Sequence, residues 1–225
     1  NKSAWQDTVR IMQAAAKATN PRHFVAAMSR YDAEYINYFT GLKAIPLYSS
    51  SQGYVPKLPY RSNSARKEIL VGPLNKNKIE DRRTDRRFVK DLIQPTNETK
   101  YTFATAHSLY KNYYWKQLMQ HKATIILPYA VMSYGITELY ALGMPLFVPS
   151  MKLMKEYPGL YPNDRAMTGP VLAPTLYCAE QYDIIPDKHS SSRHPYSPES
   201  NQTDAKYYWL QFADFYQWPH ITYFD

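Results

Sequence analysis

The chain has 225 residues, and its 27 Lys and Arg residues exceed its 19 Asp and Glu residues to give a formal net charge of +8. An apolar fraction of 44% excludes a wholly disordered chain, because such a chain cannot bury enough apolar surface to offset the ordering entropy. A single cysteine excludes an intrachain disulfide framework and a cysteine-based zinc or iron–sulfur site. The purely apolar runs are far shorter than the roughly 20 residues that cross a bilayer.

Segments of helix length alternate with short apolar or β-branched runs along the chain. In chain order, the expected elements are helix 4–18, strand 23–28, helix 33–39, strand 44–48, strand 68–73, strand 101–105, helix 108–121, strand 123–127, helix 133–142, strand 145–148 and helix 204–217. Alternation with short connections is typical of parallel βαβ units. The sequence therefore predicts an α/β protein with a Rossmann-like parallel sheet and flanking helices.

Local residue chemistry predicts where several of these elements end. Asp32 is expected to cap the second helix, and Gly41 to end it. The Ser- and Pro-rich stretch 49–65 is typical of a linker. Residues 150–203 are expected to form long surface loops, and the last helix to carry Tyr208, Phe212 and Phe215 on one face.

The positive charge fits either a nucleic acid or a small phosphorylated ligand. The densest basic segment, 81–87, holds four arginines and two acids, and it is typical of a solvated helix face. No zinc-finger spacing, Arg/Gly repeat or RNP-type aromatic motif accompanies it. His107, His121 and His220 are scattered without metal-ligand spacing, so no metal is expected.

Residues 123–149 carry the clearest functional pattern, which is a buried strand, a loop, a short helix, a stop at Gly143 and another buried strand. Ligands of open parallel sheets bind at the carboxyl ends of the strands. Backbone amides of Ser133, Tyr134 and Gly135 are expected at the helix N-terminus, where the helix dipole favours a phosphate. Glu138, one turn into the helix, is placed to accept hydrogen bonds from ribose hydroxyls. Two further donor-binding candidates are Tyr129, in the loop, and Lys76, after the turn that follows strand 68–73.

The stretch 133–146 resembles the donor-binding lobe of two-lobed glycosyltransferases of the GT-B type, with a helix that bears Glu followed by Gly-x-Pro and a strand. The resemblance implies that Glu138 holds the nucleotide ribose and that residues 133–135 bind the diphosphate. Residues 194–196 and 218–225 are weakly similar to the closing region of the N-acetylglucosaminyltransferase V family, which favours a UDP-sugar donor.

The resemblance also implies a division of the chain. Residues 1–48 would be the C-terminal part of an acceptor-side lobe, 49–65 the interdomain linker and 66–225 the nucleotide-sugar-binding lobe. In inverting enzymes of this fold the catalytic base usually lies in the acceptor lobe, where Asp32 is the carboxylate near a strand end. The N-cap role of Asp32 remains the alternative.

The expected function is therefore metal-independent transfer of a sugar from a nucleotide diphosphate, preferably a UDP-sugar, to a hydroxyl of a glycan or glycolipid acceptor, with no cofactor and no nucleic-acid partner. Sequons at Asn97 and Asn201 favour a glycoprotein of the secretory pathway, in the Golgi lumen. The chain is expected to be a fragment, with any membrane anchor upstream. Two alternatives remain open: a non-catalytic, degenerate glycosyltransferase-like scaffold or sugar-binding module, and a basic nucleic-acid-binding protein that stacks Tyr and Arg on bases.

Overall fold

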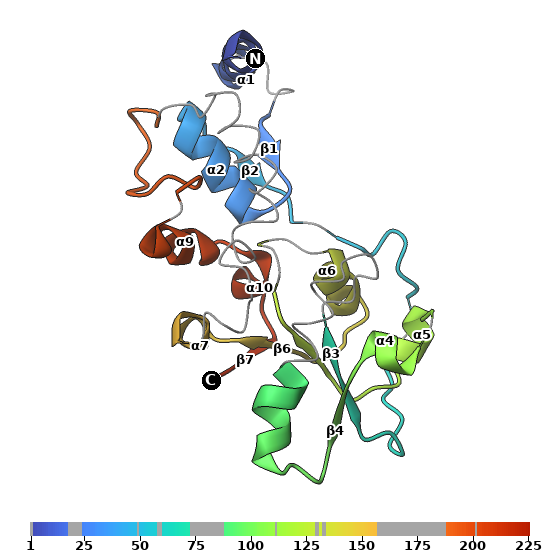
Figure 1. Ribbon diagram of the computed structural model, residues 1–225. Helices are drawn as coiled ribbons and strands as arrows, with labels where there is room; N and C mark the ends of the chain where they lie inside the picture. Colours follow the sequence, from blue (N-terminus) through green and yellow to red (C-terminus); the bar gives the residue numbers. More distant parts are fainter. Residues whose placement is uncertain are drawn as a thin grey trace. The chain divides into compact units, whose positions relative to one another are not determined.

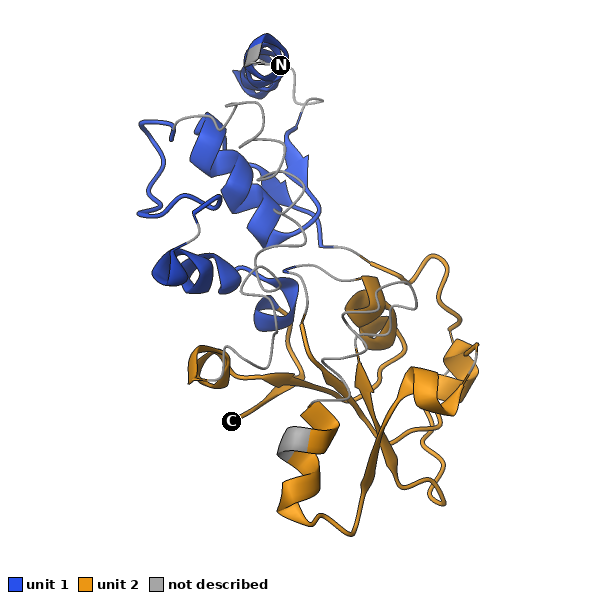
Figure 2. Cartoon of the chain, in the orientation of Figure 1, with its two compact units in different colours: residues 1–49, 130–132, 167–217 blue, residues 50–129, 133–166, 218–225 orange. Residues whose placement is uncertain are grey.

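The computed structural model describes residues 2–17, 24–48, 50–57, 60–72, 88–110, 112–128, 131, 134–156, 188–200 and 202–225. The chain divides into two compact units (Figure 2). Unit 1 gathers residues 1–49, 130–132 and 167–217, and unit 2 gathers residues 50–129, 133–166 and 218–225. The Arg-rich segment 81–87, Cys178 and the sequon at Asn201 lie outside the described residues.

Unit 2 is built on a five-stranded sheet (Figure 1). Its strands are β3 (Glu68–Gly72), β4 (Thr102–Thr105), β5 (Thr124–Ile126), β6 (Leu146–Pro149) and β7 (Ile221–Phe224). Their order is β4-β3-β5-β6-β7, and every neighbouring pair is parallel. The predicted α/β class with a parallel sheet is confirmed, and β7 is a strand that the sequence pattern did not predict.

The core of unit 2 lies on both faces of this sheet. Leu70 in β3 pairs in register with Ala104 on one side and Thr124 on the other. Leu70, Val71 and Val148 are fully buried. Parallel strands covered on both faces have nearly continuous apolar sequences, which explains why β3, β5 and β6 were predictable from apolar runs.

Helices connect the strands of unit 2. They are α4 (Ala106–Leu109), α5 (Trp115–Leu118), α6 (Tyr134–Ala141) and α7 (Met151–Glu156), with a π-helical segment Phe88–Ile93 and a 3-10 helix Gln94–Thr96. The predicted helix 108–121 is wrong, because two short helices occupy this region. Tyr110 is extended, and α5 begins at Trp115 after its N-cap Tyr114, whose backbone N–H donates to the Gln117 side chain at 2.9 Å.

The strand order of unit 2 reverses at one place. From β3 the chain adds β4 on one side, and it then returns to add β5, β6 and β7 on the other. In open α/β sheets, ligands bind outside the carboxyl ends of the strands at such a reversal. The carboxyl ends of β3 and β5 are joined there by the Leu127 amide, which donates to the Gly72 carbonyl at 2.8 Å.

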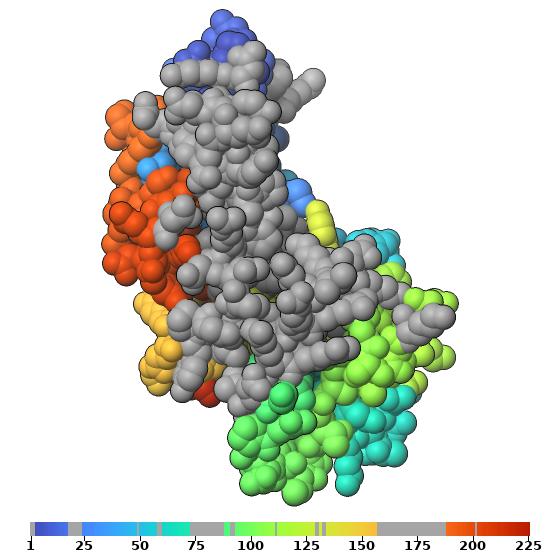
Figure 3. Space-filling model, viewed as in Figure 1, coloured from blue at the N-terminus to red at the C-terminus, as the bar shows by residue number. Residues whose placement is uncertain are grey.

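Unit 1 contains α1 (Lys2–Lys17), α2 (Arg30–Thr40), α9 (Thr203–Leu210), α10 (Asp214–Gln217) and a two-stranded parallel ribbon of β1 (Ala26–Ala27) and β2 (Ile45–Pro46). Its core is aromatic. Trp209 of α9 is buried edge-on against Tyr31 and Tyr38 of α2, with ring centroids 5.8 Å and 6.0 Å away. In Figure 3, residues 188–200 and α9 gather on one face of unit 1, and the Trp209 indole donates to the Tyr196 carbonyl at 3.1 Å.

The ends of α2 show one correction and one confirmation. Ser29 is the N-cap, since its extended backbone lets its hydroxyl accept from the Asp32 amide at 3.0 Å. Asp32 therefore lies inside the helix and is not its cap. Gly41 ends the helix as predicted, with a φ of 70° and its N–H bonded to the Asn37 carbonyl.

Three other predictions for unit 1 and the loop region need correction. The strands expected over 23–28 and 44–48 shrink to two residues each, and Phe24 is exposed. The expected helix 204–217 is two helices, so Phe215 lies in α10 while the Tyr208 and Phe212 rings pack together at 5.7 Å. The stretch 150–203 is not only surface loop, because it contains α7 and the fully buried His194.

Among the helices of the described residues, none combines the length and the apolar character that crossing a membrane requires.

Candidate functional site

The first residues of α6 lie just after the carboxyl end of β5. Tyr134 and Gly135 begin the helix, which confirms the predicted order of strand and helix, and no acidic residue occupies its first turn. Such an N-terminus attracts anions through its free amides and its dipole. Tyr129, Ser133 and Lys76 lie outside the described residues, so their donor-binding roles stay predictions.

Glu138 lies one turn into α6 and takes part in a polar network. Its Oε1 accepts a hydrogen bond from the Tyr54 hydroxyl at 2.9 Å. The buried Ser51 hydroxyl lies 3.1 Å from the Tyr54 oxygen and 2.8 Å from Oγ1 of Thr137, the residue before Glu138. Thr137 also donates to the Tyr134 carbonyl at 2.8 Å. This network holds the Glu138 carboxylate beside the start of the helix.

Tyr54 acts as the donor in this network. Partial desolvation of its hydroxyl raises the pKa of Tyr54, the hydrogen bond with Ser51 opposes that shift, and the hydrogen bond to Glu138 and the negative charge of that carboxylate add to it. The phenol therefore keeps its proton at neutral pH. A protonated phenol orients one carboxylate oxygen and leaves the other acceptor positions of Glu138 available to a ligand.

Aromatic side chains lie near this carboxylate. The Tyr54 ring packs against Trp115 with centroids 6.0 Å apart. Burial raises the pKa of Tyr113, and the charge of Glu138 contributes to that shift. Tyr134 is 58% exposed. Exposed rings close to an anion-binding helix end can stack on the π-face of a nucleobase.

The far end of α6 contacts the segment just before β7. The Tyr140 hydroxyl donates to the Pro219 carbonyl at 3.2 Å, and its ring packs on Trp218 at 4.9 Å. Gly143 adopts a φ of 69° and donates to the Tyr140 carbonyl, as expected for a helix stop. The helix that carries Glu138 is thus held at both ends.

Asp32 lies in unit 1, whereas α6 lies in unit 2. One of its carboxylate oxygens accepts from the Ser29 hydroxyl at 2.9 Å. Burial raises the pKa of Asp32, and the Ser29 hydrogen bond opposes that shift. A raised pKa suits a general base that works near neutral pH. The catalytic role of Asp32 itself stays a prediction.

His121 has a structural role. It is fully buried, with Nδ1 3.0 Å from the Glu68 carbonyl and Nε2 2.8 Å from the Tyr110 hydroxyl. Burial lowers the pKa of His121, so the ring is neutral, donates to the carbonyl through Nδ1 and accepts from Tyr110. Within the described ranges, no three His, Cys, Asp or Glu side chains are grouped as ligands of a metal ion.

Sequence reasoning missed Ser51, Tyr54 and Trp115. Ser51 and Tyr54 fall in the Ser- and Pro-rich stretch that was interpreted as a linker, and Trp115 falls in a helix that was predicted too long. Tyr54 is 84 positions away from Glu138 in the sequence. No local pattern signals a pair so far apart.

No protein-family model, curated protein or solved structure matches this chain. The chemistry of the candidate site therefore rests on its own residues.

Proposed function

We propose that the protein is a metal-independent glycosyltransferase of the GT-B type that binds a nucleotide diphosphate sugar, preferably a UDP-sugar, at the N-terminal end of α6. The acceptor in this proposal is a hydroxyl of a glycan or glycolipid. The observation that carries the proposal is the Glu138 carboxylate, which Tyr54 orients one turn inside the helix that follows β5. That helix begins at the carboxyl edge where the strand order reverses.

Each part of the donor has a matching feature. The diphosphate would lie against the amides of the first turn of α6, a turn that contains no acidic residue. The ribose hydroxyls would donate to Glu138, since an ionised carboxylate only accepts hydrogen bonds. Exposed aromatic rings such as Tyr134 would cover the base.

The reaction needs charge stabilisation at the leaving group. The acceptor oxygen bonds to the anomeric carbon while the bond from that carbon to the diphosphate breaks and the diphosphate takes the electron pair. The acceptor proton passes to a general base, the role that we propose for Asp32. Fixed amide dipoles aimed at the diphosphate stabilise the charge that develops there.

The first experiment measures the melting temperature of the purified chain with UDP, GDP and CMP titrated separately. A ligand that binds only the folded state adds about 2.7 kcal/mol at 100 times its Kd. For a chain of this size that corresponds to a rise of roughly 5–10 °C. We expect UDP to give the largest rise.

The variant that tests the site is Glu138→Ala, which we expect to weaken UDP binding at least tenfold because the ribose loses its acceptor. The matched control is Glu156→Ala, since Glu156 is an exposed carboxylate of unit 2 at the end of α7. No rise with any nucleotide, or an equal loss in both variants, would overturn the proposal. Nucleotide binding without sugar transfer would favour a degenerate scaffold.

Residence in the Golgi lumen is part of the same proposal. The Asn97 side chain is exposed just after the 3-10 helix, with a φ of 52°. An exposed sequon in a secretory protein accepts an N-glycan. Peptide N-glycosidase should lower the apparent mass of the protein from its native source, and Asn97→Gln should reduce that change. A protein from that source without any glycan would argue against the luminal assignment.

A further inference from the structure

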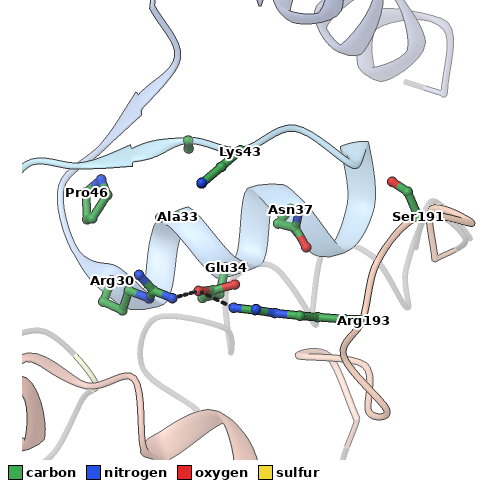
Figure 4. A pocket seen from close by; sticks show the side chains of 9 residues that line it. Arg30, Ala33, Glu34, Asn37, Lys43, Pro46, Ser191 and Arg193 are labelled. Carbon is green, nitrogen blue, oxygen red and sulfur yellow. Dashed lines mark hydrogen bonds and ion pairs between the residues drawn. The ribbon is translucent and has the colours of Figure 1, made fainter.

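Unit 1 contains a pocket of about 350 Å³ beside α2 (Figure 4). Arg30, Glu34 and Asn37 line it from the helix, Lys43 from the segment before β2, and Ser191 and Arg193 from the segment that follows residue 187. Figure 4 shows the two arginines reaching Glu34 from opposite sides, with Lys43 across the pocket.

The walls of the pocket are fixed by the fold. The His189 amide donates to the Tyr38 carbonyl at 2.9 Å, next to the left-handed Gly41. A Cβ on Gly41 would collide with the His189 and Ser191 side chains, so this glycine lets the segment approach α2. The Lys188 ammonium donates to the His194 carbonyl at 2.6 Å, which closes the segment on itself.

Glu34 is only 7% exposed, and three side chains satisfy it. Arg30 forms an ion pair with it, Arg193 lies 3.5 Å from Oε1, and His194 Nε2 lies 2.9 Å from Oε2. Burial lowers the pKa of His194, and its bond to Glu34 opposes that shift. The neutral ring donates through Nε2, because a carboxylate only accepts, and its Nδ1 accepts from the Tyr208 hydroxyl at 2.7 Å.

The pocket therefore carries more positive charge than the Glu34 carboxylate neutralises. Arg30, Lys43 and Arg193 supply three positive charges and Glu34 one negative charge, which leaves a surplus of two. Lys43 is exposed, and no carboxylate among the described residues pairs with it. A guanidinium has five donors, so both arginines keep donors beyond those that face Glu34.

We propose that this pocket binds the anionic group of a monosaccharide-sized ligand. A phosphate, sulfate or carboxylate would lie between Lys43 and the arginines, where charge-assisted hydrogen bonds are strongest. Asn37 keeps one N–H donor and its carbonyl acceptor beside its bond to the Leu42 carbonyl, and Ser191 offers acceptor capacity beside its bond with His189 Nδ1. The volume is at the small end of ligand pockets. This site belongs to unit 1 and is independent of the function proposed for α6.

The test is calorimetric titration of the full chain with inorganic phosphate, inorganic sulfate, glucose 6-phosphate and glucuronate, with glucose as the neutral control. We expect saturable binding of the anions and none of glucose. Lys43→Gln should weaken binding at least tenfold without changing the melting temperature, because Lys43 does not contact Glu34. The matched control Lys17→Gln removes an exposed charge of unit 1 that does not line the pocket.

The anions distinguish the source of the ligand. Tighter binding of glucose 6-phosphate than of inorganic phosphate supports a sugar phosphate as the ligand. Tighter binding of glucuronate than of glucose 6-phosphate supports an acidic sugar. Equal binding of inorganic phosphate and glucose 6-phosphate supports a free inorganic anion. The proposal is overturned if no anion binds at millimolar concentration, or if Lys43→Gln and Lys17→Gln behave alike. Since UDP binding is measured through Glu138→Ala, failure of one site does not imply failure of the other.

Discussion

Asp214 is a buried carboxylate at the start of α10 in unit 1. It is 2% exposed, and within the part of the chain that the structure describes neither of its carboxylate oxygens has a hydrogen-bond partner. Burial raises the pKa of Asp214 to about 7, and the negative charge of Asp32 adds to the shift. Near neutral pH this single side chain therefore changes between a neutral and a charged buried group.

This shift predicts that the folded state loses stability as the pH rises. The folded pKa lies above the unfolded value near 3.8, so between about pH 4 and pH 7 the unfolded chain has released a proton that the folded chain still binds. The free energy of unfolding therefore falls across that range and levels off above pH 7. The upper limit of the loss is roughly 4 kcal/mol.

Asp214→Asn should remove most of this pH dependence and raise the melting temperature at pH 8 more than at pH 5. The matched control is Asp204→Asn, since Asp204 is an exposed residue in the first turn of α9. Melting temperatures of the three proteins at both pH values provide the measurement. If the two variants show the same pH profile, Asp214 does not titrate in this range.

At the scale of elements, the C-terminal end of α2 depends on one backbone conformation. Gly41 has a φ of 70°, which costs a residue with a Cβ about 1–2 kcal/mol. A Cβ there also collides with His189 and Ser191. Gly41→Ala should therefore destabilise unit 1 by about 2 kcal/mol or more, measured as the urea midpoint followed by Trp fluorescence.

Gly53→Ala is the matched control for this prediction. Gly53 has no positive φ, and a Cβ there meets nothing within 4 Å. Its substitution should change the free energy of unfolding by no more than about 0.5 kcal/mol. Equal effects of both alanine substitutions would show that neither the backbone conformation nor the contact at Gly41 stabilises the helix end.

Elements with a strong local pattern were predictable from the sequence. The apolar runs gave β3, β5 and β6, and α6 was placed by its periodicity and by Gly143. The two longest predicted helices of the second half were wrong because the first is interrupted by the extended Tyr110 and the second by a turn. The turn after α9, where Phe212 and Ala213 donate back to Trp209 and Leu210, lets Asp214 begin a new helix.

Only the part of the candidate site that one continuous stretch of sequence forms was predictable. Glu138 and the start of α6 follow from one continuous stretch, whereas Tyr54 and Ser51 reach this stretch across 84 and 86 positions. The pocket of unit 1 was missed for the same reason, since 160 positions separate His194 from Glu34. Local sequence patterns do not indicate contacts between residues that are so far apart in the sequence.

At the scale of the whole molecule, three separate stretches of chain form each unit, so no single cut in the sequence separates them. β7, formed by the last residues of the chain, pairs with β6 through four residue pairs from Leu146–Ile221 to Pro149–Phe224. The tertiary arrangement therefore joins a strand from the middle of the sequence to a strand at its C-terminal end. The net charge is also a property of the whole molecule. It helps to decide whether the ligand of this protein is a nucleotide sugar or a nucleic acid.

A net charge of +8 predicts weak, sequence-independent association with single-stranded oligonucleotides at low salt. If four phosphates are contacted, affinity should fall roughly fiftyfold between about 50 and about 200 mM salt. UDP, which is proposed to bind through amides and Glu138, should lose much less affinity over that range. Glu138→Ala should weaken UDP binding and leave oligonucleotide binding unchanged. Tight oligonucleotide binding at the higher salt concentration, with no UDP binding, would favour the nucleic-acid reading because the specific contacts would then be made to bases.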